Sequence, residues 1–484
     1  MKQYFLLLCT MCWMALWGAE EKESSTTTHT LSLADGSSLE YKATAGHLFL
    51  KDENEKSQAS LFFVSYEKTP KAGEVRPISF CFNGGPGSSS IWLHMGLLGP
   101  KKVSIPDLQP AAPPYTIVPN GESLLAVSDL VLIDPVSTGF SVAIPPEEGK
   151  KFHGVDEDAE SIGEFIRLYL TRYQRWSAPK FLIGESYGAT RAAVLADHLQ
   201  EKLGIVLNGL VLISPALHFQ SLDFTNGNDL PYLLFLPTYT ATAWYHKRLS
   251  PELQQNLDKT LVQAKQFVEK EYLSALFLGD ALPSQQKMAI IDKLHELTSL
   301  PKEYLSSCRL RPKDLQFLKQ LLKNQQLMIS RMDSRWVGPD SHATESAVHH
   351  DPGLDGIIGS FVSAFQTYLQ EDLKVNREQP YRFLTNVQPW NYGVTNQHLN
   401  VSNQLESVLW KNPSLRIFVA SGIFDVATPF YATEYALRHL QSSTFSSDQI
   451  VSKEYPAGHM MYLHPPSFQR LAKDLIQFYT PSGS

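Results

Sequence analysis

Cysteine is scarce in this sequence, and its scarcity limits the classes of protein to consider. The 484 residues include four cysteines, of which Cys9 and Cys12 lie in an apolar segment near the N-terminus. If that segment is removed, Cys81 and Cys308 remain, which is too few for a disulfide-stapled extracellular scaffold. Cys81 falls within a predicted buried strand, where a free thiol is expected rather than a disulfide.

Concentrated basic charge is also lacking. Charged residues make up 19% of the chain and the formal net charge is -7. No basic patch indicates a nucleic-acid partner. The apolar run at residues 4–17 is too short for an ordinary membrane-spanning helix.

Residues 1–19 have the layout of a secretory signal peptide. Lys2 supplies positive charge, residues 4–17 form the apolar region, and Gly18 and Ala19 are the small residues at the predicted cleavage site. We therefore expect a secreted or periplasmic protein with no stable membrane span after signal removal. A retained N-terminal membrane anchor is the alternative.

Buried strands and amphipathic helices alternate along much of the chain. Residues 20–30 are polar and are expected to form a disordered leader, and alternation predicts antiparallel strands at 31–33, 39–50 and 60–67. Buried strands are predicted at 77–82, 129–133, 180–183, 209–213, 415–421 and 449–455. Helices are predicted at 156–173, 189–203, 430–440 and 466–479. This order indicates an α/β fold whose mainly parallel sheet has helices on both faces.

The middle of the chain has a different pattern. Helices are predicted at 238–246, 251–272, 285–298, 313–328 and 357–369, without a convincing strand. The chain therefore divides into a first core part at 31–215, a helical cap insertion at 216–385, and a second core part at 386–484. Such a cap is expected to cover the carboxyl ends of the strands, where open α/β folds bind substrates.

A G-x-S-x-G motif stands between a predicted strand and a predicted helix. Gly184-Glu185-Ser186-Tyr187-Gly188 follows the strand at 180–183 directly. This context is typical of a nucleophile elbow, a sharp turn in which close neighbours of the serine must lack side chains. The prediction is that Ser186 Oγ projects above the sheet, at the N-terminus of a helix.

A serine nucleophile requires a base, and the base requires an orienting group. Asp425 and His459 each follow a late predicted strand, in the order that α/β-hydrolases use. His464, Asp351 and Asp355 are rivals, but none directly follows a predicted sheet strand. We therefore expect Ser186, Asp425 and His459 to form a catalytic triad.

A glycine-rich turn follows the strand at 77–82. Asn83-Gly84-Gly85-Pro86-Gly87 exposes backbone N–H groups that could form an oxyanion hole. A phosphate cradle is less well supported, because no G-K-[ST] follows, and a purely structural turn remains the third interpretation.

Polar residues that could ligate a metal gather late in the predicted cap. They are His342, His349, His350, Asp351 and Asp355. Their spacing fits no metal-binding pattern, so a solvated surface is expected and no metal site is predicted.

Five stretches in order resemble the serine carboxypeptidase family, in its bacterial form. They are residues 83–90, 134–141, 184–188, 422–425 and 458–460. The resemblance covers about residues 61–479 and is weakest in the cap. It implies an α/β-hydrolase fold and removal of single residues from peptide C-termini.

The resemblance also implies roles for individual residues. The catalytic triad comprises Ser186, Asp425 and His459. The oxyanion hole comprises the N–H groups of Gly85 and Tyr187. The site for the substrate carboxylate comprises Asn83, Gly84 and Glu185.

Three departures from the family pattern affect these expectations. Ser88 stands where the family commonly has a cysteine, so a familiar disulfide is missing. Leu97 stands where a second carboxylate-recognising glutamate is expected. Gly188-Ala189 replaces the usual Ala-Gly after Tyr187.

The sequence thus predicts a serine-type carboxypeptidase that acts on peptide or protein C-termini through an acyl-enzyme, without a metal or organic cofactor. One alternative is an esterase or acyltransferase on the same fold, although such a pocket has no need for a carboxylate clamp at Glu185. Another is a non-catalytic binding protein, although that role would not require the complete triad.

Overall fold

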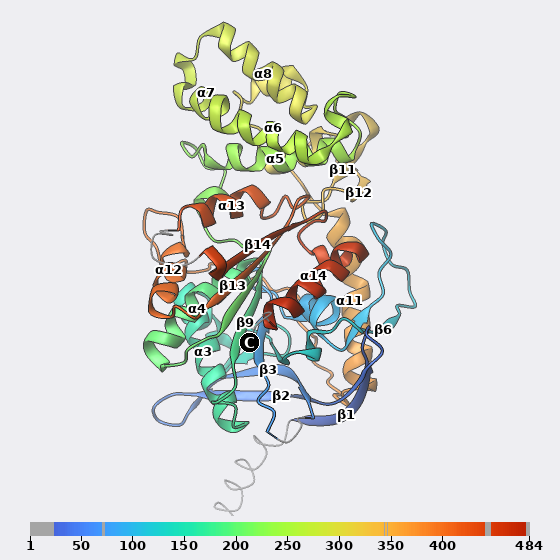
Figure 1. Ribbon diagram of the computed structural model, residues 1–484, viewed down its shortest axis with the longest axis vertical. Coiled ribbons are helices and arrows are strands. Elements are labelled where there is room, and N and C mark those ends of the chain that lie inside the picture. The colour runs from blue at the N-terminus through green and yellow to red at the C-terminus, as the bar shows by residue number, and fades with distance from the viewer. Residues whose placement is uncertain (1–23, 70–72, 343, 346, 441–446, 481–484) are drawn as a thin grey trace, which may run out of the picture.

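The computed structural model describes residues 24–69, 73–342, 344–345, 347–440 and 447–480 (Figure 1). Its centre is a ten-stranded sheet in the order β1-β2-β3-β7-β4-β9-β10-β13-β14, with β8 (Val142–Ala143) paired to β3. The predicted signal peptide at 1–19 lies outside the described residues.

The sheet has an antiparallel edge and a parallel centre. The antiparallel strands are β1 (Ser25–Ser32), β2 (Ser38–Lys51) and β3 (Ser57–Lys68). The parallel strands are β7 (Asp129–Ile133), β4 (Ile78–Phe82), β9 (Lys180–Glu185), β10 (Gly209–Ile213), β13 (Arg416–Gly422) and β14 (Ile450–Tyr455). The predicted mainly parallel sheet is confirmed.

Successive side chains of the central strands enter two separate hydrophobic cores. In β4, Phe80 and Phe82 belong to one core while Cys81 belongs to the other. Strands buried on both faces explain why these segments are almost continuously apolar in the sequence.

Helices cover both faces (Figure 1). One core is completed by α3 (Val155–Arg172), α4 (Tyr187–Leu203) and α12 (Ser402–Lys411). The other is completed by α11 (Pro352–Glu371) and α14 (Pro465–Tyr479). The predicted helices at 156–173 and 466–479 match α3 and α14 closely.

A helical block stands over one end of the sheet and has its own hydrophobic core (Figure 1). Its helices are α5 (Leu230–Tyr245), α6 (Leu257–Phe267), α7 (Leu273–Leu278), α8 (Ser284–Thr298), α9 (Lys302–Ser307) and α10 (Asp314–Gln320). Helix α5 is buried along most of its length and also packs against α13 (Phe430–Arg438).

Three features differ from the predictions. Residues 25–30 are not a disordered leader but part of β1, which pairs along its own full length with residues 38–45 of β2. The cap contains a hairpin, β11 (Leu327–Ile329) and β12 (Val337–Pro339), where only helix was expected. Helix α11, expected in the cap, packs its apolar face on the central sheet instead.

Helix α12 was missed by the sequence prediction. Among the described residues, no helix is long and apolar enough to cross a membrane.

Candidate active site

Ser186 has a strained backbone at the junction of β9 and α4. Its φ is 61° and its ψ is -126°, a combination that residues with a side chain rarely adopt. A Cβ on Gly184 would lie 2.1 Å from the Gly188 carbonyl oxygen, and one on Gly188 would lie 2.7 Å from that of Phe82. These close approaches explain both glycines and agree with the predicted sharp turn.

Asp425 and His459 form a buried pair. His459 Nδ1 lies 2.8 Å from Asp425 Oδ2, and the two side chains are 3% and 0% exposed. The other Asp425 oxygen accepts the backbone N–H groups of Ala427 and Thr428, at 2.8 and 2.9 Å. The carboxylate is therefore fixed by backbone donors while it orients the imidazole.

The end of β10 brings these loops next to the elbow. The Ser186 N–H donates to Ile213 O at 2.9 Å. The next residue, Ser214, donates its hydroxyl to His459 O at 2.7 Å, and its carbonyl oxygen lies 3.0 Å from the Thr428 hydroxyl oxygen. The loops that carry Ser186, Asp425 and His459 thus meet at the end of one strand.

Thr428 is a functional candidate that the sequence prediction missed. Its hydroxyl donates to Asp425 Oδ2 at 2.7 Å and lies 3.2 Å from His459 Nδ1. No motif in the sequence marks Thr428, because its contacts with Ser214 and His459 join separate segments of the chain.

Opposing effects act on the pKa of His459. Burial disfavours the imidazolium, but the charge and hydrogen bond of Asp425 outweigh burial, and the pKa is raised above its usual value. Asp425 therefore stabilises the protonated, positively charged imidazole of His459. This is the form that the imidazole takes after it accepts a proton from a serine hydroxyl.

Asn83 and Glu185 form a second buried pair beside the triad. Asn83 Nδ2 donates to Glu185 Oε1 at 3.1 Å, and Asn83 Oδ1 accepts the Leu93 N–H at 3.0 Å. Burial raises the pKa of Glu185 to about 7, with a further increase from Asp425, although His459, Tyr462 and Asn83 lower it. Glu185 therefore exchanges its proton near neutral pH.

One oxygen of this carboxyl group is unpaired. Within the described residues, Glu185 Oε2 and the Tyr462 hydroxyl are both buried and neither has a partner in hydrogen-bonding geometry. Tyr462 is nevertheless near enough to lower the pKa of Glu185. Sequence reasoning missed Tyr462, since nothing in the motif around His459 links it to Glu185.

The glycine-rich turn after β4 lies against the elbow. A Cβ on Gly84 would lie 2.5 Å from the backbone nitrogens of both Tyr187 and Gly188. Gly85 has a φ of 104°, which favours glycine. In the described part of the chain, neither the Gly85 nor the Tyr187 N–H donates to a protein acceptor. Two backbone donors are therefore available beside Ser186.

Helix α4 secures this turn through a buried ion pair. Arg191 Nε donates to Asp158 Oδ2 at 2.6 Å, and its Nη1 donates to Asn83 O at 2.5 Å. Both charged side chains are almost fully buried. Arg191 was not predicted as a site residue, because its partners are remote in the sequence.

The cap reaches the triad through the turn of its hairpin. The His459 N–H donates to Met332 O at 2.6 Å, and the Gly458 N–H donates to Asp333 Oδ2 at 3.1 Å. A Cβ on Gly458 would lie 2.3 Å from Met332 O, so this contact requires glycine. The hairpin thus fixes the backbone that carries His459.

The departures from the family pattern are also visible. Ser88 makes hydrogen bonds with Ser89 O and Trp92 Nε1 instead of a disulfide, and Leu97 is buried. Cys81 is a buried free thiol, as expected, and Cys308 is also free.

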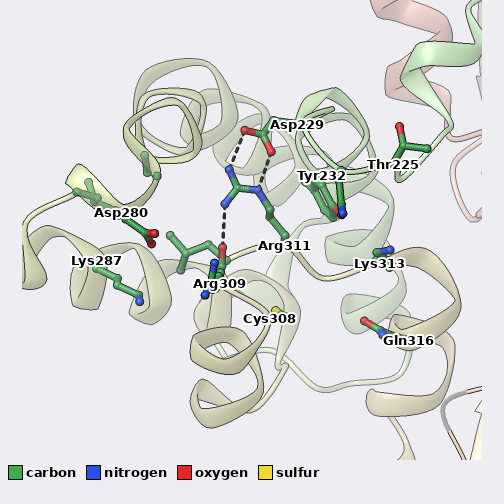
Figure 2. Close-up of a pocket in the computed structure, with 16 residues that line it drawn as sticks. Thr225, Asp229, Tyr232, Asp280, Lys287, Cys308, Arg309, Arg311, Lys313 and Gln316 are labelled. Atoms are coloured by element: carbon green, nitrogen blue, oxygen red, sulfur yellow. Dashed lines mark hydrogen bonds and ion pairs between the residues drawn. The ribbon is translucent and has the colours of Figure 1, made fainter. Parts of the chain in front are cut away.

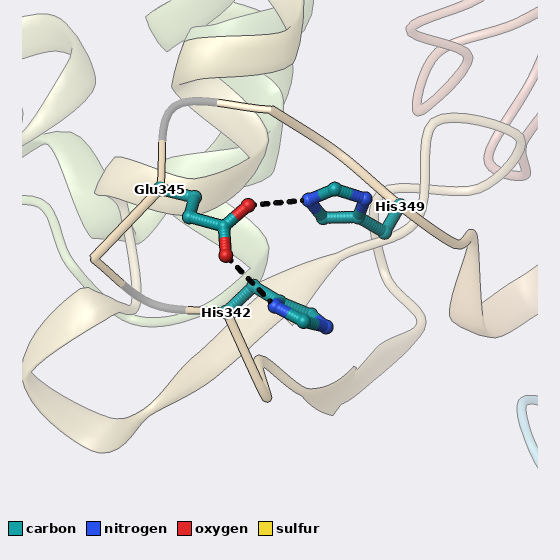
Figure 3. A group of neighbouring side chains, drawn as sticks. All are labelled: His342, Glu345 and His349. Atoms are coloured by element: carbon teal, nitrogen blue, oxygen red, sulfur yellow. Dashed lines mark hydrogen bonds and ion pairs between the residues drawn. The ribbon is translucent and has the colours of Figure 1, made fainter.

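Part of the polar group near residue 342 comes together. Glu345 bridges His342 and His349 on the surface (Figure 3). Asp351 instead caps α11, accepting the N–H groups of Gly353 and Leu354. Of the five polar residues noted in the sequence, His342 and His349 come together, and they are joined by Glu345, which was not among those five.

A separate cavity of about 630 Å³ lies within the cap (Figure 2). It is lined by both signs of charge, and Arg311 makes a two-bond ion pair with Asp229 at 2.6 and 2.8 Å. Ser186, Asp425 and His459 are not among its lining residues, so it does not contain the candidate reaction centre.

The sheet, the elbow and the site define an α/β-hydrolase. The chain matches the serine carboxypeptidase family over residues 35–460 and belongs to that family. The predicted family is confirmed.

Relatives and solved structures support this assignment. Serine carboxypeptidase-like 36 of Arabidopsis thaliana is 29% identical over 172 residues, which are 35% of this chain and 34% of that protein. Pheromone-processing carboxypeptidase KEX1 of Saccharomyces cerevisiae is 32% identical over 158 residues, 30% and 20% of the two chains. The matched segments span about a third and a fifth of these relatives.

The crystal structure of KEX1(delta)p, a prohormone-processing carboxypeptidase from Saccharomyces cerevisiae, has the same fold. The TM-score is 0.58 at 16% identity, and the match covers 91% of each chain.

Proposed function

We propose that this chain is a serine carboxypeptidase that hydrolyses the last peptide bond of peptides through an acyl-enzyme on Ser186. The observation that carries the proposal is the buried 2.8 Å pair of His459 Nδ1 and Asp425 Oδ2 beside a strained serine. Family membership agrees with this chemistry.

The reaction divides into two acyl transfers. His459 Nε2 takes the proton from Ser186 Oγ as the oxygen attacks the carbonyl carbon, and Asp425 stabilises the imidazolium. His459 then gives that proton to the leaving amine, which departs as the C-terminal amino acid. Water repeats the steps on the ester and restores Ser186. The N–H groups of Gly85 and Tyr187 stabilise the oxyanion in both transfers.

The substrate carboxylate binds to Asn83, the Gly84 N–H and Glu185. Two carboxyl groups in contact share a proton, and the raised pKa of Glu185 favours the protonated form that can donate a hydrogen bond. This requirement distinguishes a carboxypeptidase from an esterase, whose substrate carries no terminal carboxylate.

Export is a separate part of the proposal. Lys2 and the apolar run that follows support a signal peptide over residues 1–19. This part is tested by measuring the mass of the chain recovered outside the cytoplasm. A chain that still carries residues 1–19 would contradict cleavage of a signal peptide.

The activity is tested with matched peptides that end in a free carboxylate or in an amide. We expect stepwise release of free amino acids from the acids and much slower turnover of the amides. Ser186→Ala should abolish both turnover and labelling by a fluorophosphonate. The proposal would be contradicted if peptides ending in a carboxylate and in an amide were turned over equally. Cleavage within long peptides, or a preference for simple esters, would also contradict it.

A further inference from the structure

The loop between β12 and α11 carries three metal-ligating side chains on the surface of the protein (Figure 3). His342 Nδ1 lies 3.0 Å from Glu345 Oε1, and His349 Nε2 lies 2.7 Å from Glu345 Oε2. One ligand atom from each residue lies within 4.8 Å of the others. None of the three takes part in the reaction proposed above.

The chemistry of this group suits a borderline metal ion. Two imidazoles and one carboxylate are typical zinc ligands, with bonds of about 2.0–2.2 Å. Two ligand atoms of a tetrahedral ion with such bonds are about 3.3 Å apart. The two measured contacts are slightly shorter, so small side-chain rotations would admit an ion between the three groups.

The donor types also suit a cation. A carboxylate oxygen and an imidazole nitrogen each offer a lone pair to a metal ion.

A buried lysine holds the backbone of this loop. Lys319 Nζ donates to His342 O at 2.7 Å and to Ala347 O at 3.1 Å, and it pairs with Asp340 at 3.4 Å. The Glu345 N–H donates to His342 O at 2.9 Å. These bonds fix the spacing of the ligands before an ion arrives, which lowers the entropy lost on binding.

We propose that His342, Glu345 and His349 bind one Zn²⁺ ion, with water completing the coordination. The three side chains are 47%, 50% and 46% exposed, so the ion can enter directly from solvent. The site stabilises the cap and has no part in the chemistry at Ser186.

The loop leads directly to contacts behind the triad. Asp351 accepts the Ser330 hydroxyl at 2.5 Å and the Arg331 N–H at 2.6 Å. The following residue, Met332, accepts the His459 N–H. An ion in the loop therefore stiffens the segment that connects the hairpin to α11.

Binding is tested by calorimetric titration of the chelator-treated mature protein with Zn²⁺, and by absorption after addition of Co²⁺. We expect one ion per chain, visible Co²⁺ bands of a low-coordinate site, and a rise in the thermal midpoint. His342→Ala, Glu345→Gln and His349→Ala should each weaken binding by at least about tenfold, while Ca²⁺ should not compete.

His350→Ala is the matched control, because His350 is next to the group but is not one of its members. This variant should bind as the wild type does. Circular dichroism of each metal-free variant establishes that it is folded. The proposal would be overturned if the wild type did not bind one Zn²⁺ ion per chain, or if Ca²⁺ displaced the ion. It would also be overturned if the three ligand variants bound Zn²⁺ as the wild type does, or if His350→Ala lost as much affinity as they do.

Discussion

Ser186 is held in a conformation that costs on the order of 1–3 kcal/mol and that the surrounding structure must enforce. The G-x-S-x-G motif allows this strain to be predicted, because Gly184 and Gly188 are needed for the close approaches around it. Thr428 and Tyr462 could not be assigned in this way. Their roles depend on side-chain contacts across separate segments, which no local pattern specifies.

Thr428→Val is expected to lower kcat about tenfold with little change in KM. The variant keeps the shape of the side chain but removes the hydroxyl donor from Asp425 Oδ2, and a hydrogen bond to a charged group contributes about 1.5 kcal/mol or more. Steady-state kinetics on a peptide acid measure the effect. Thr428→Ser should keep most of the activity. A wild-type kcat for the valine variant would contradict the role of this hydroxyl.

Glu185 is expected to make KM rise with pH. In the proposed function the protonated carboxyl of Glu185 binds the substrate carboxylate, so binding is expected to be strongest below the pKa of about 7 and to be lost as pH rises through it. The KM of a peptide acid should rise from pH 5 to pH 8 in the wild type, whereas Glu185→Gln should show much less change. A simple ester provides the control. Superimposable KM profiles for the two enzymes on the acid would refute this assignment.

Among the elements, the central strands were predicted well because they are buried on both faces and are apolar throughout. Only the end of strand β1 was predicted, by the expected strand at 31–33. The rest was missed because its composition is polar, although threonine favours strands and the pairing with β2 fixes it. Helix α11 was placed in the wrong part of the fold. Its apolar face is evident from the sequence, but the layer that it covers is decided by tertiary packing.

Helix α4 links the elbow to the carboxylate site, and this link can be tested. Arg191→Met should raise the KM for peptide acids, because Asn83 O loses its partner. It should also destabilise the protein by about 3–5 kcal/mol, since Asp158 is left charged and buried. Kinetics and urea unfolding measure the two effects.

The double variant Asp158→Leu and Arg191→Met separates these effects. Removing both charges should restore much of the lost stability, but KM should stay high because the bond to Asn83 is still absent. If the double variant recovers both quantities, Arg191 does not position Asn83.

On the scale of the whole molecule, the cap and the reaction centre share one packing unit. Phe424 and Val426, which flank Asp425, belong to the hydrophobic core of the cap, and the hairpin supports His459. The cap was expected from the sequence as a helical block over the strand ends. Its contact with the loop that carries His459 was not expected, because the hairpin has no strong strand signal in the sequence.

Two buried acids make the stability of the folded chain depend on pH. Burial is the main cause that raises the pKa of Glu185 and of Asp134 to about 7 each, from ordinary values of 4.5 and 3.8. Between these limits the folded state holds protons that the unfolded state has released. The contribution of these two groups to the free energy of unfolding is therefore fully present below their ordinary pKa values and is lost as pH rises through about 7. The opposite effect of His94, whose pKa burial lowers to about 3, is confined to lower pH, below its ordinary value of 6.5.

Comparison of variants isolates these contributions from the other titrating groups. Between pH 5 and pH 8, the wild type should lose about 3 kcal/mol more unfolding free energy than Glu185→Gln, at about 1.4 kcal/mol per pH unit for one group. Asp134→Asn should show a similar difference. The Ser90 N–H and the Tyr381 hydroxyl both donate to Asp134 Oδ1, so the asparagine must place its amide oxygen, not its NH₂ group, at that position. Urea unfolding at several pH values provides the measurement. If the wild type and both variants change in parallel, these carboxyl groups are ionised in the folded protein at neutral pH, and Glu185 cannot donate a hydrogen bond to the substrate there.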